Sequence, residues 1–293
     1  MRSFSAHSIA APRASAGVRR RSSLRLPASW SVDKLGAWLL ALLWVAPLLY
    51  AGWTAFREPS AAFSLTLTSG WTFGDIARAW EQAPWLIYMR NTMLLVASIL
   101  VGQFVLCTLA AYAFARFEFR GKGLLFSLVL LQLFILPEVL IVENYAMVSR
   151  LGWSDTIWGM GVPYMASAFG VFLLRQAFKQ VPRELEDAAR IEGCSRLGVL
   201  WRVYIPLARP VYLAYALVSV STHWNNFLWP LVVSSLLDAR PLTVGLSLFG
   251  APESGVSISL ISAATLLTTL PLLVGFLIFQ RQFMQAFLHS GLR

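Results

Sequence analysis

The chain has 293 residues, of which 57% are hydrophobic and only 13% are charged. Soluble domains carry about twice that share of charged residues, so the composition excludes an ordinary soluble enzyme and indicates an integral membrane protein. The net charge of +10 does not indicate nucleic-acid binding, because the basic residues stand beside apolar runs, where they match anionic lipid headgroups.

The chain begins with a basic tail at residues 1–34, rich in Ser, Ala and Arg, with a run from Arg19 to Arg21. We expect this tail to be disordered. A secretory signal also has basic residues before an apolar run, but the run at residues 35–56 is longer than a signal core and lacks a clean cleavage site. We therefore expect residues 35–87 to hold a retained first transmembrane helix and an external loop.

Five more apolar runs follow, each near or above the ~20 residues that a helix needs to cross the hydrocarbon core. They lie at residues 88–115, 124–142, 156–174, 211–236 and 258–279. The expected fold is thus an all-α membrane protein with six transmembrane helices, in which residues 88–281 form the membrane core and 282–293 a short tail.

The basic residues orient these six spans. Nineteen of the 24 Lys and Arg fall on the termini and on the loops that share their side, and five fall on the other side. By the positive-inside rule, both termini and the loop at residues 181–210 are cytoplasmic.

This cytoplasmic loop is the most polar stretch between spans, and its first half predicts a short helix. Pro182 suits a first helical position, where its missing N–H is not needed. Glu184, Glu186 and Asp187 place negative charge at the positive end of the helix dipole. One face carries a modest stripe suited to a partner's groove, made of Leu185, Ala188 and Ala189.

The second half of the loop predicts another helix after a hinge. Gly193 accepts the left-handed turn that ends a helix, and Ser195 can cap the next one. We expect one face of this second helix to be formed by Leu197, Leu200, Trp201 and Tyr204, until Pro206 and Pro210 break the run. The residues alone leave open a plainer alternative, an amphipathic loop that rests on the membrane surface.

The spacing of the loop resembles the EAA loop of ABC importer permeases, in which E-A-A is followed by Gly and, about a dozen residues later, by Pro. Asp187, Glu192 and Cys194 stand where that family usually has Glu, Asp and Ala. The resemblance implies a cytoplasmic two-helix coupling loop that seats in a cleft of an ATPase subunit. The residues implied in this contact are Glu184, Asp187, Ala188, Ala189, Glu192, Gly193 and Pro206.

Further motifs, in order along the chain, resemble carbohydrate-importer permeases of the MalG type. They are Arg90-Asn91-Thr92, residues 111–117, Phe119-Arg120-Gly121, Leu136-Pro137, residues 151–159, residues 172–176, the W-N-N-F-L-W-P run at residues 224–230, and Gln280-Arg281-Gln282-Phe283.

This resemblance implies an inner-membrane permease subunit for a sugar or a sugar-like solute such as glycerol 3-phosphate. Its implied partners are two ABC ATPase subunits, a second homologous permease, an extracellular or periplasmic solute-binding protein and the lipid bilayer, with no nucleic acid. The chain has no G-x-x-x-x-G-K-[ST] phosphate loop, so ATP is expected on a separate subunit and no cofactor or metal on this one.

Polar residues inside the spans are candidates for the solute pathway, because a buried amide or carboxyl in hydrocarbon is costly unless it faces a cavity or a partner. Amides bond to sugar hydroxyls and indole faces stack on C–H surfaces. The candidates are Glu138, Asn144, Trp224, Asn225 and Asn226, beside the helix breaker Pro137 or within the W-N-N-F-L-W-P run. Hydrogen bonding between helices is the alternative role for any one of them.

Two other function classes fit the sequence less well. A self-sufficient secondary transporter or channel would show inverted repeats and midplane carboxylates, and no such repeat is visible. An intramembrane enzyme would need a nucleophile with a base, and the sequence shows no catalytic constellation. The two cysteines, Cys107 and Cys194, lie on different kinds of surface and predict no disulfide.

Overall fold

The computed structural model describes residues 29–61, 70–250 and 257–291. The chain divides into two units, Met1–Pro47 and Leu48–Arg293. The described part of the first unit is the beginning of α1 (Ser29–Ala55), whose apolar side chains from Leu35 to Leu43 are largely exposed, as a lipid-facing helix requires. Most of the expected basic tail, residues 1–28, lies outside the described residues.

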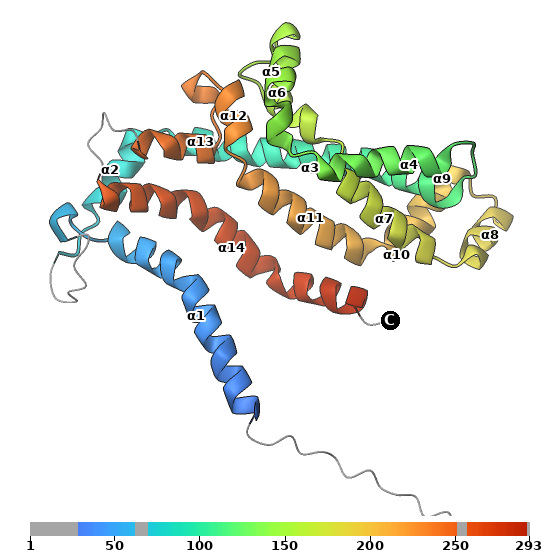
Figure 1. Ribbon diagram of the computed structural model, residues 1–293, viewed down its shortest axis with the longest axis horizontal. Coiled ribbons are helices and arrows are strands. Elements are labelled where there is room, and N and C mark those ends of the chain that lie inside the picture. The colour runs from blue at the N-terminus through green and yellow to red at the C-terminus, as the bar shows by residue number, and fades with distance from the viewer. Residues whose placement is uncertain (1–28, 62–69, 251–256, 292–293) are drawn as a thin grey trace, which may run out of the picture. The chain divides into compact units, whose positions relative to one another are not determined.

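The second unit is built from helices and short helical turns (Figure 1). The α-helices after α1 are α2 (Gly74–Gln82), α3 (Trp85–Arg116), α4 (Lys122–Leu131), α5 (Ile141–Arg150), α6 (Ile157–Gly161), α7 (Ala168–Gln180), α8 (Arg183–Ile191), α9 (Arg196–Val199), α10 (Ile205–Leu207), α11 (Arg209–Trp224), α12 (Leu228–Val233), α13 (Leu242–Leu246) and α14 (Ile258–Gly291).

The shorter turns are η1 (Pro59–Ala61), η2 (Gln132–Phe134), η3 (Pro137–Leu140), η4 (Val162–Tyr164), η6 (Leu237–Ala239) and η7 (Ser247–Gly250), with one π-helical turn, η5 (Leu200–Tyr204). Over the described ranges, extended backbone pairs only in the isolated bridge between Arg57 and Trp71. The predicted all-helical class is confirmed for that part of the chain.

Three helices are individually long and apolar enough to cross a membrane: Lys34–Ala55, Trp85–Arg116 and Ile258–Ile278. Three further candidates are bent pairs of helices, with angles of 94° between Lys122–Phe134 and Pro137–Arg150, 49° between Ile157–Tyr164 and Ala168–Gln180, and 77° between Arg196–Leu207 and Arg209–Trp224. The described residues therefore hold three to six candidate spans.

The predicted apolar run at residues 211–236 is not one helix. The α11 helix ends at Trp224, and the short α12 begins only at Leu228. Pro230 explains the break, because its ring clashes with a helical carbonyl four residues earlier, at Asn226. That freed carbonyl instead accepts a hydrogen bond from Thr243 Oγ1 at 2.8 Å.

The long α3 helix is the centre of the second unit, and it packs against α6, α7, α11 and α13. The contact with α7 is close because Gly170 has no side chain: a Cβ there would lie 2.7 Å from the Tyr215 hydroxyl and 3.0 Å from Cys107 Sγ. In Figure 1, α8 and α9 lie at one end of this unit, and α2 and α13 at the other.

The last helix, α14, packs against α11 and α2. It continues to Gly291, so residues 282–291, expected as a separate tail, extend the helix of the last span.

Candidate functional site

The loop at residues 181–210 forms two helical segments with a hinge between them. The first segment, α8, begins directly after Pro182, as predicted. The hinge is at Gly193, whose φ of +84° is a left-handed conformation that suits glycine. Ser195 Oγ then accepts a hydrogen bond from the N–H of Gly198 at 3.1 Å and caps the next segment.

A buried carboxylate ties this loop to the membrane core. Glu186 accepts a hydrogen bond from the Tyr204 hydroxyl at 2.5 Å and one from Arg190 at 2.6 Å. Arg116 Nε, from the last turn of α3, lies 3.6 Å from Glu186 Oε2, and both side chains are more than nine-tenths buried. Arg116 also donates to the carbonyl of Val181. The Glu186 cluster, defined as Glu186, Arg116, Arg190 and Tyr204, therefore joins α3, α8 and η5.

Tyr204 contacts both members of the buried ion pair, Glu186 and Arg116. Its ring lies under the Arg116 guanidinium, 4.9 Å from ring centroid to Cζ, and it packs against Tyr112 and Phe178. Burial, together with the hydrogen bond to Glu186, raises the pKa of Tyr204, so its hydroxyl stays protonated and remains a donor at neutral pH.

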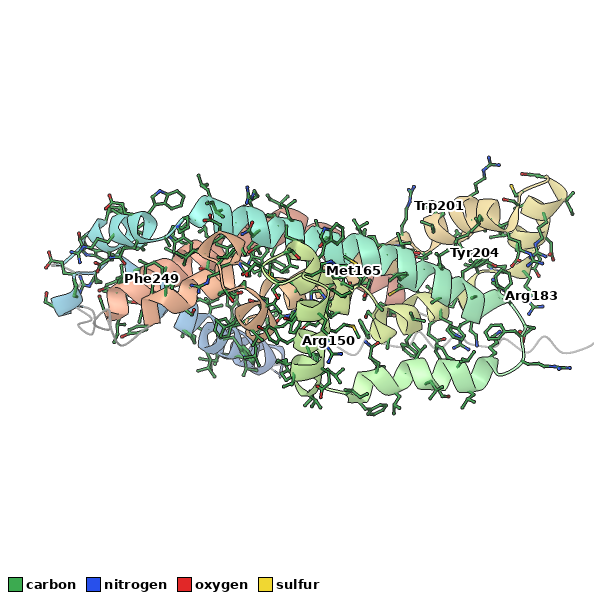
Figure 2. The ribbon with its side chains drawn as sticks, turned by 90° about the horizontal axis from the view of Figure 1, so that it is seen from above. Arg150, Met165, Arg183, Trp201, Tyr204 and Phe249 are labelled. Atoms are coloured by element: carbon green, nitrogen blue, oxygen red, sulfur yellow. The ribbon has the colours of Figure 1, made fainter. Side chains whose placement is uncertain are left out.

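The prediction that four side chains of the second segment share one apolar face is wrong. Leu200 and Tyr204 are buried, whereas Leu197 and Trp201 are 58% and 67% exposed. Each pair is separated by four residues and therefore forms its own row on the helix, and only one row packs into the aromatic cluster beside α3. Figure 2 shows Trp201 and Tyr204 leaving the same segment in different directions.

The other residues predicted for the coupling contact lie on the outside of the loop. Five of these seven residues are exposed, and two are half-buried. In order, the exposed ones are Glu184, Asp187, Ala188, Glu192 and Gly193, and the half-buried ones are Ala189 and Pro206. The structure thus separates an outer face of the loop from the inner contact made by Glu186.

A cavity of about 590 Å³ lies at the bends of the first two broken helices and at the break between α11 and α12, within the range of small-molecule sites. Four of the five predicted pathway residues line it, from three separate elements: Glu138, Asn144, Asn225 and Asn226. Trp224 does not line the cavity; it is buried in the apolar cluster that contains Trp85 and Leu242.

One wall of the cavity is a network of uncharged polar side chains. Gln103, buried on α3, donates through Nε2 to the carbonyl of Tyr164 at 2.8 Å and lies 3.1 Å from His223 Nε2. Its Oε1 accepts a hydrogen bond from Ser219 at 2.6 Å. The network joins α3, η4 and α11 and gives the cavity a polar wall without placing a charge in it.

Comparison of the sequence with known protein families gives a match that covers this arrangement. The profile of the family described as "binding-protein-dependent transport system inner membrane component" matches residues 103–289, from the buried Gln103 through the loop and the cavity to α14. The chain belongs to this family. It is a permease component of a binding-protein-dependent transport system.

Curated relatives of this permease cover nearly its whole length. The permease protein AraQ of an arabinooligosaccharide transport system from Halalkalibacterium halodurans is 29% identical over 94% of this chain and 100% of its own. The permease protein UgpE of an sn-glycerol-3-phosphate transport system from Yersinia pestis is 30% identical over 85% of this chain and 92% of its own.

Solved structures share the fold. A bacterial ABC transporter involved in import of the acidic polysaccharide alginate superimposes with a TM-score of 0.75 at 21% identity, over 87% of this chain and 96% of the other. The same kind of transporter in complex with its alginate-bound periplasmic protein gives a TM-score of 0.61 at 15% identity, over 88% and 93%.

Two parts of this permease's site were missed by the sequence analysis. Glu186 was expected only as a helix-dipole charge; its spacing from Arg190 was a visible signal, but Arg116, far away in sequence, was not. Gln103 was also missed, although an amide inside an apolar run was the available signal. Over the described residues no cluster of His, Cys, Asp or Glu could hold a metal ion.

Proposed function

We propose that this permease is one of two homologous membrane subunits of an ABC importer for carbohydrates, and that two separate ATPase subunits drive it through the loop at residues 181–210. The observation that carries the proposal is the two-sided loop: an exposed outer face suited to a partner, and an inner face held to the membrane core by the buried Glu186 cluster.

The cluster offers a mechanical route from the ATPase to the solute. Arg116, which holds α8, and Gln103, which forms the cavity wall, stand on the same unbroken helix α3. Thirteen helical residues correspond to about 20 Å of rise. A rigid helix that is fixed at both places transmits a displacement of α8 to the cavity without any change of its own backbone.

The outer face supplies the contact with the ATPase. Trp201, Leu197 and Ile191 expose apolar surface beside the charged side chains of Glu184 and Asp187. Apolar anchors inside a polar rim are typical of protein interfaces. Ala188 and Ala189 are small enough to let α8 approach a groove closely, as the EAA resemblance implies.

The second permease would close the open side of the cavity. Phe134, Leu136 and Val139, at the bend between α4 and α5, are 84%, 67% and 68% exposed. Irregular backbone at membrane depth is tolerated only where protein or a water-filled cavity covers it. A homologous subunit packed here would cover the bend and line the other half of the pathway.

We further propose six spans, to which each bent pair contributes one, with both termini in the cytoplasm and the binding protein on the opposite side. In the last pair only Arg209–Trp224 enters the membrane, and Arg196–Leu207 stays in the cytoplasm as part of the coupling loop. An Arg120→Cys substitution should be protected from an impermeant thiol reagent added outside, and Leu237→Cys should react, in a Cys194→Ala background. Labelling of Arg120→Cys but not Leu237→Cys would reverse the orientation.

The alternative of a self-sufficient transporter or channel receives less support. Glu138 is the one carboxylate among the cavity-lining residues in the described ranges, and a proton or ion path commonly needs several ionisable groups.

The function is tested by uptake and ATP hydrolysis of the complete importer in proteoliposomes. Asp187→Arg or Gly193→Pro should leave the subunit inserted but lower ATP-dependent sugar uptake at least tenfold, because the outer face and its hinge are altered. The matched control is Asp238→Arg, an exposed acidic residue on η6. Normal uptake by both loop variants, with normal ATPase binding, would disprove coupling through this loop.

A further inference from the structure

Family membership does not decide the charge of the solute. Among the relatives, AraQ is named for neutral arabinooligosaccharides and UgpE for the anion sn-glycerol 3-phosphate, and the solved transporters are described with the acidic polysaccharide alginate. The side chains that this chain contributes to the cavity can decide between these classes.

The part of the cavity lining that the structure describes lacks Lys and Arg side chains. Within the described residues, Glu138 is the one carboxylate of the lining. His223 also lines the cavity, but its Nε2 lies 3.1 Å from the Gln103 amide nitrogen, which is a donor, so the ring accepts there and is not a cation. Arg150, at the end of α5, and Arg175, which donates to the carbonyl of Phe114 at 3.1 Å, lie outside the lining. A charged group in this cavity would therefore meet one carboxylate and no cation from this subunit.

Two of the backbone donors at the start of α7 that could replace a cation are already in use. The α7 helix begins at the cavity, and the N-terminus of a helix is a favourable place for an anion. Here the N–H of Ala168 donates to Gln132 Oε1 at 3.0 Å, and the N–H of Gly170 donates to Ser167 Oγ at 3.2 Å. Two of the protein's own side chains thus occupy the position that a phosphate or carboxylate would need.

The same lining suits hydroxyl groups. Amide side chains both donate and accept hydrogen bonds, as sugar hydroxyls do. Asn144 of α5 and Asn225 and Asn226, at the break between α11 and α12, bring three amides to the lining. Asn225 also donates to the carbonyl of Ser221 at 2.8 Å, which leaves its second N–H and its oxygen for a solute. Tyr164 and Phe227 add aromatic surface to the same lining, on which the C–H faces of a sugar ring can pack.

We propose that this permease passes an electrically neutral sugar or oligosaccharide and rejects phosphorylated and uronic acid solutes. An anion would lose its hydration without gaining a cation and would be repelled by Glu138, whereas a neutral sugar exchanges water for amide partners. The inference rests on the proposed carbohydrate-import function and adds the charge class of the solute.

The test uses the complete importer in proteoliposomes with ATP and the binding protein. The probes are a panel of neutral mono- to tetrasaccharides that includes arabinooligosaccharides, together with their uronates and phosphates, glycerol 3-phosphate and alginate oligosaccharides. Uptake of each probe is divided by the occupancy of the binding protein by that probe, measured separately, so that the ratio reports selection by the membrane subunits.

We expect ATP-dependent uptake of at least one neutral saccharide, at a normalised rate at least tenfold above that of any anion. An anionic probe imported at a normalised rate equal to or above the neutral ones would overturn the charge assignment and leave the import function standing. Absence of ATP-dependent uptake for the whole panel would overturn both.

Discussion

The C-terminal end of α3 and its middle bury polar groups in different ways. At the C-terminal end, the Glu186 cluster buries an ion pair between α3 and α8. In the middle, Gln103, Ser219 and His223 form a network without a formal charge pair, beside a cavity. Removing one partner of a buried ion pair leaves an unpaired charge, whereas an amide that loses a partner loses one hydrogen bond.

This difference fits the two tasks proposed above, a coupling joint at the Glu186 cluster and a solute pathway at the cavity. A coupling joint has to keep α8 and α3 in one relative geometry while the ATPase moves. A buried charge pair does this because separating its two charges is costly. A pathway has to release its solute as well as accept it, and uncharged hydrogen-bonding groups make contacts of moderate strength. The comparison predicts that removing the buried cation of the joint, Arg116, has a larger effect than any variant at the cavity.

The largest effect is expected from Arg116→Ala. It leaves the Glu186 carboxylate buried without its partner from α3, a change that costs about 3–5 kcal/mol in comparable pairs. We expect ATP-dependent uptake to fall more than about 100-fold. The measurement is uptake per inserted complex, with ATPase copurification as a second readout.

The matched control for this variant is Arg190→Ala. Arg190 binds the same carboxylate but is 48% exposed, so water replaces it and the loss should be small. Equal losses for the two variants would mean that burial of the pair is not what holds the loop.

Gln103→Leu should have the next largest effect. It removes the acceptor of Ser219 and the donor to the Tyr164 carbonyl in one substitution. With interhelical hydrogen bonds worth about 0.6–2 kcal/mol each, we expect uptake to fall roughly tenfold to 100-fold, measured beside assembly of the two permeases. A double-mutant cycle with Ser219→Ala should show non-additive losses, and additive losses would contradict the network.

Asn225→Leu and Asn226→Leu are expected to lower uptake about tenfold while the complex still assembles, because each removes a hydroxyl partner without much added bulk. Trp224→Phe is the adjacent control, since Trp224 packs in the core outside the cavity lining. It should lower stability more than it lowers uptake per assembled complex. Loss of assembly in both asparagine variants would instead make these amides structural.

The smallest effect at the joint is expected from Tyr204→Phe. It keeps the ring under Arg116 and removes only the hydroxyl donor to Glu186. A hydrogen bond to a charged group contributes about 1.5–3 kcal/mol, and Arg116 and Arg190 remain. We expect a measurable loss of coupling, seen as ATP hydrolysed per sugar imported, below that of Arg116→Ala. A loss as large as that of Arg116→Ala would mean that the Tyr204 hydrogen bond, and not the ion pair, holds α8 to α3.

Local patterns in the sequence were sufficient for the elements that depend on neighbouring residues. The start of α8 after Pro182, the left-handed turn at Gly193 and the cap at Ser195 follow from backbone preferences within a few residues. The break near Pro137 was also visible, because proline disrupts a helix locally.

Only the tertiary structure decided which polar and aromatic groups meet. Arg116 and Glu186 lie 70 positions apart, and Gln103 and Ser219 lie 116 apart, so no periodicity within a segment relates them. The same holds for the inner and outer rows of the second loop segment and for Trp224, whose burial depends on which neighbouring helix covers it. Sequence determines what each residue prefers locally, and packing between distant segments selects the partner with which a buried charge or amide is satisfied.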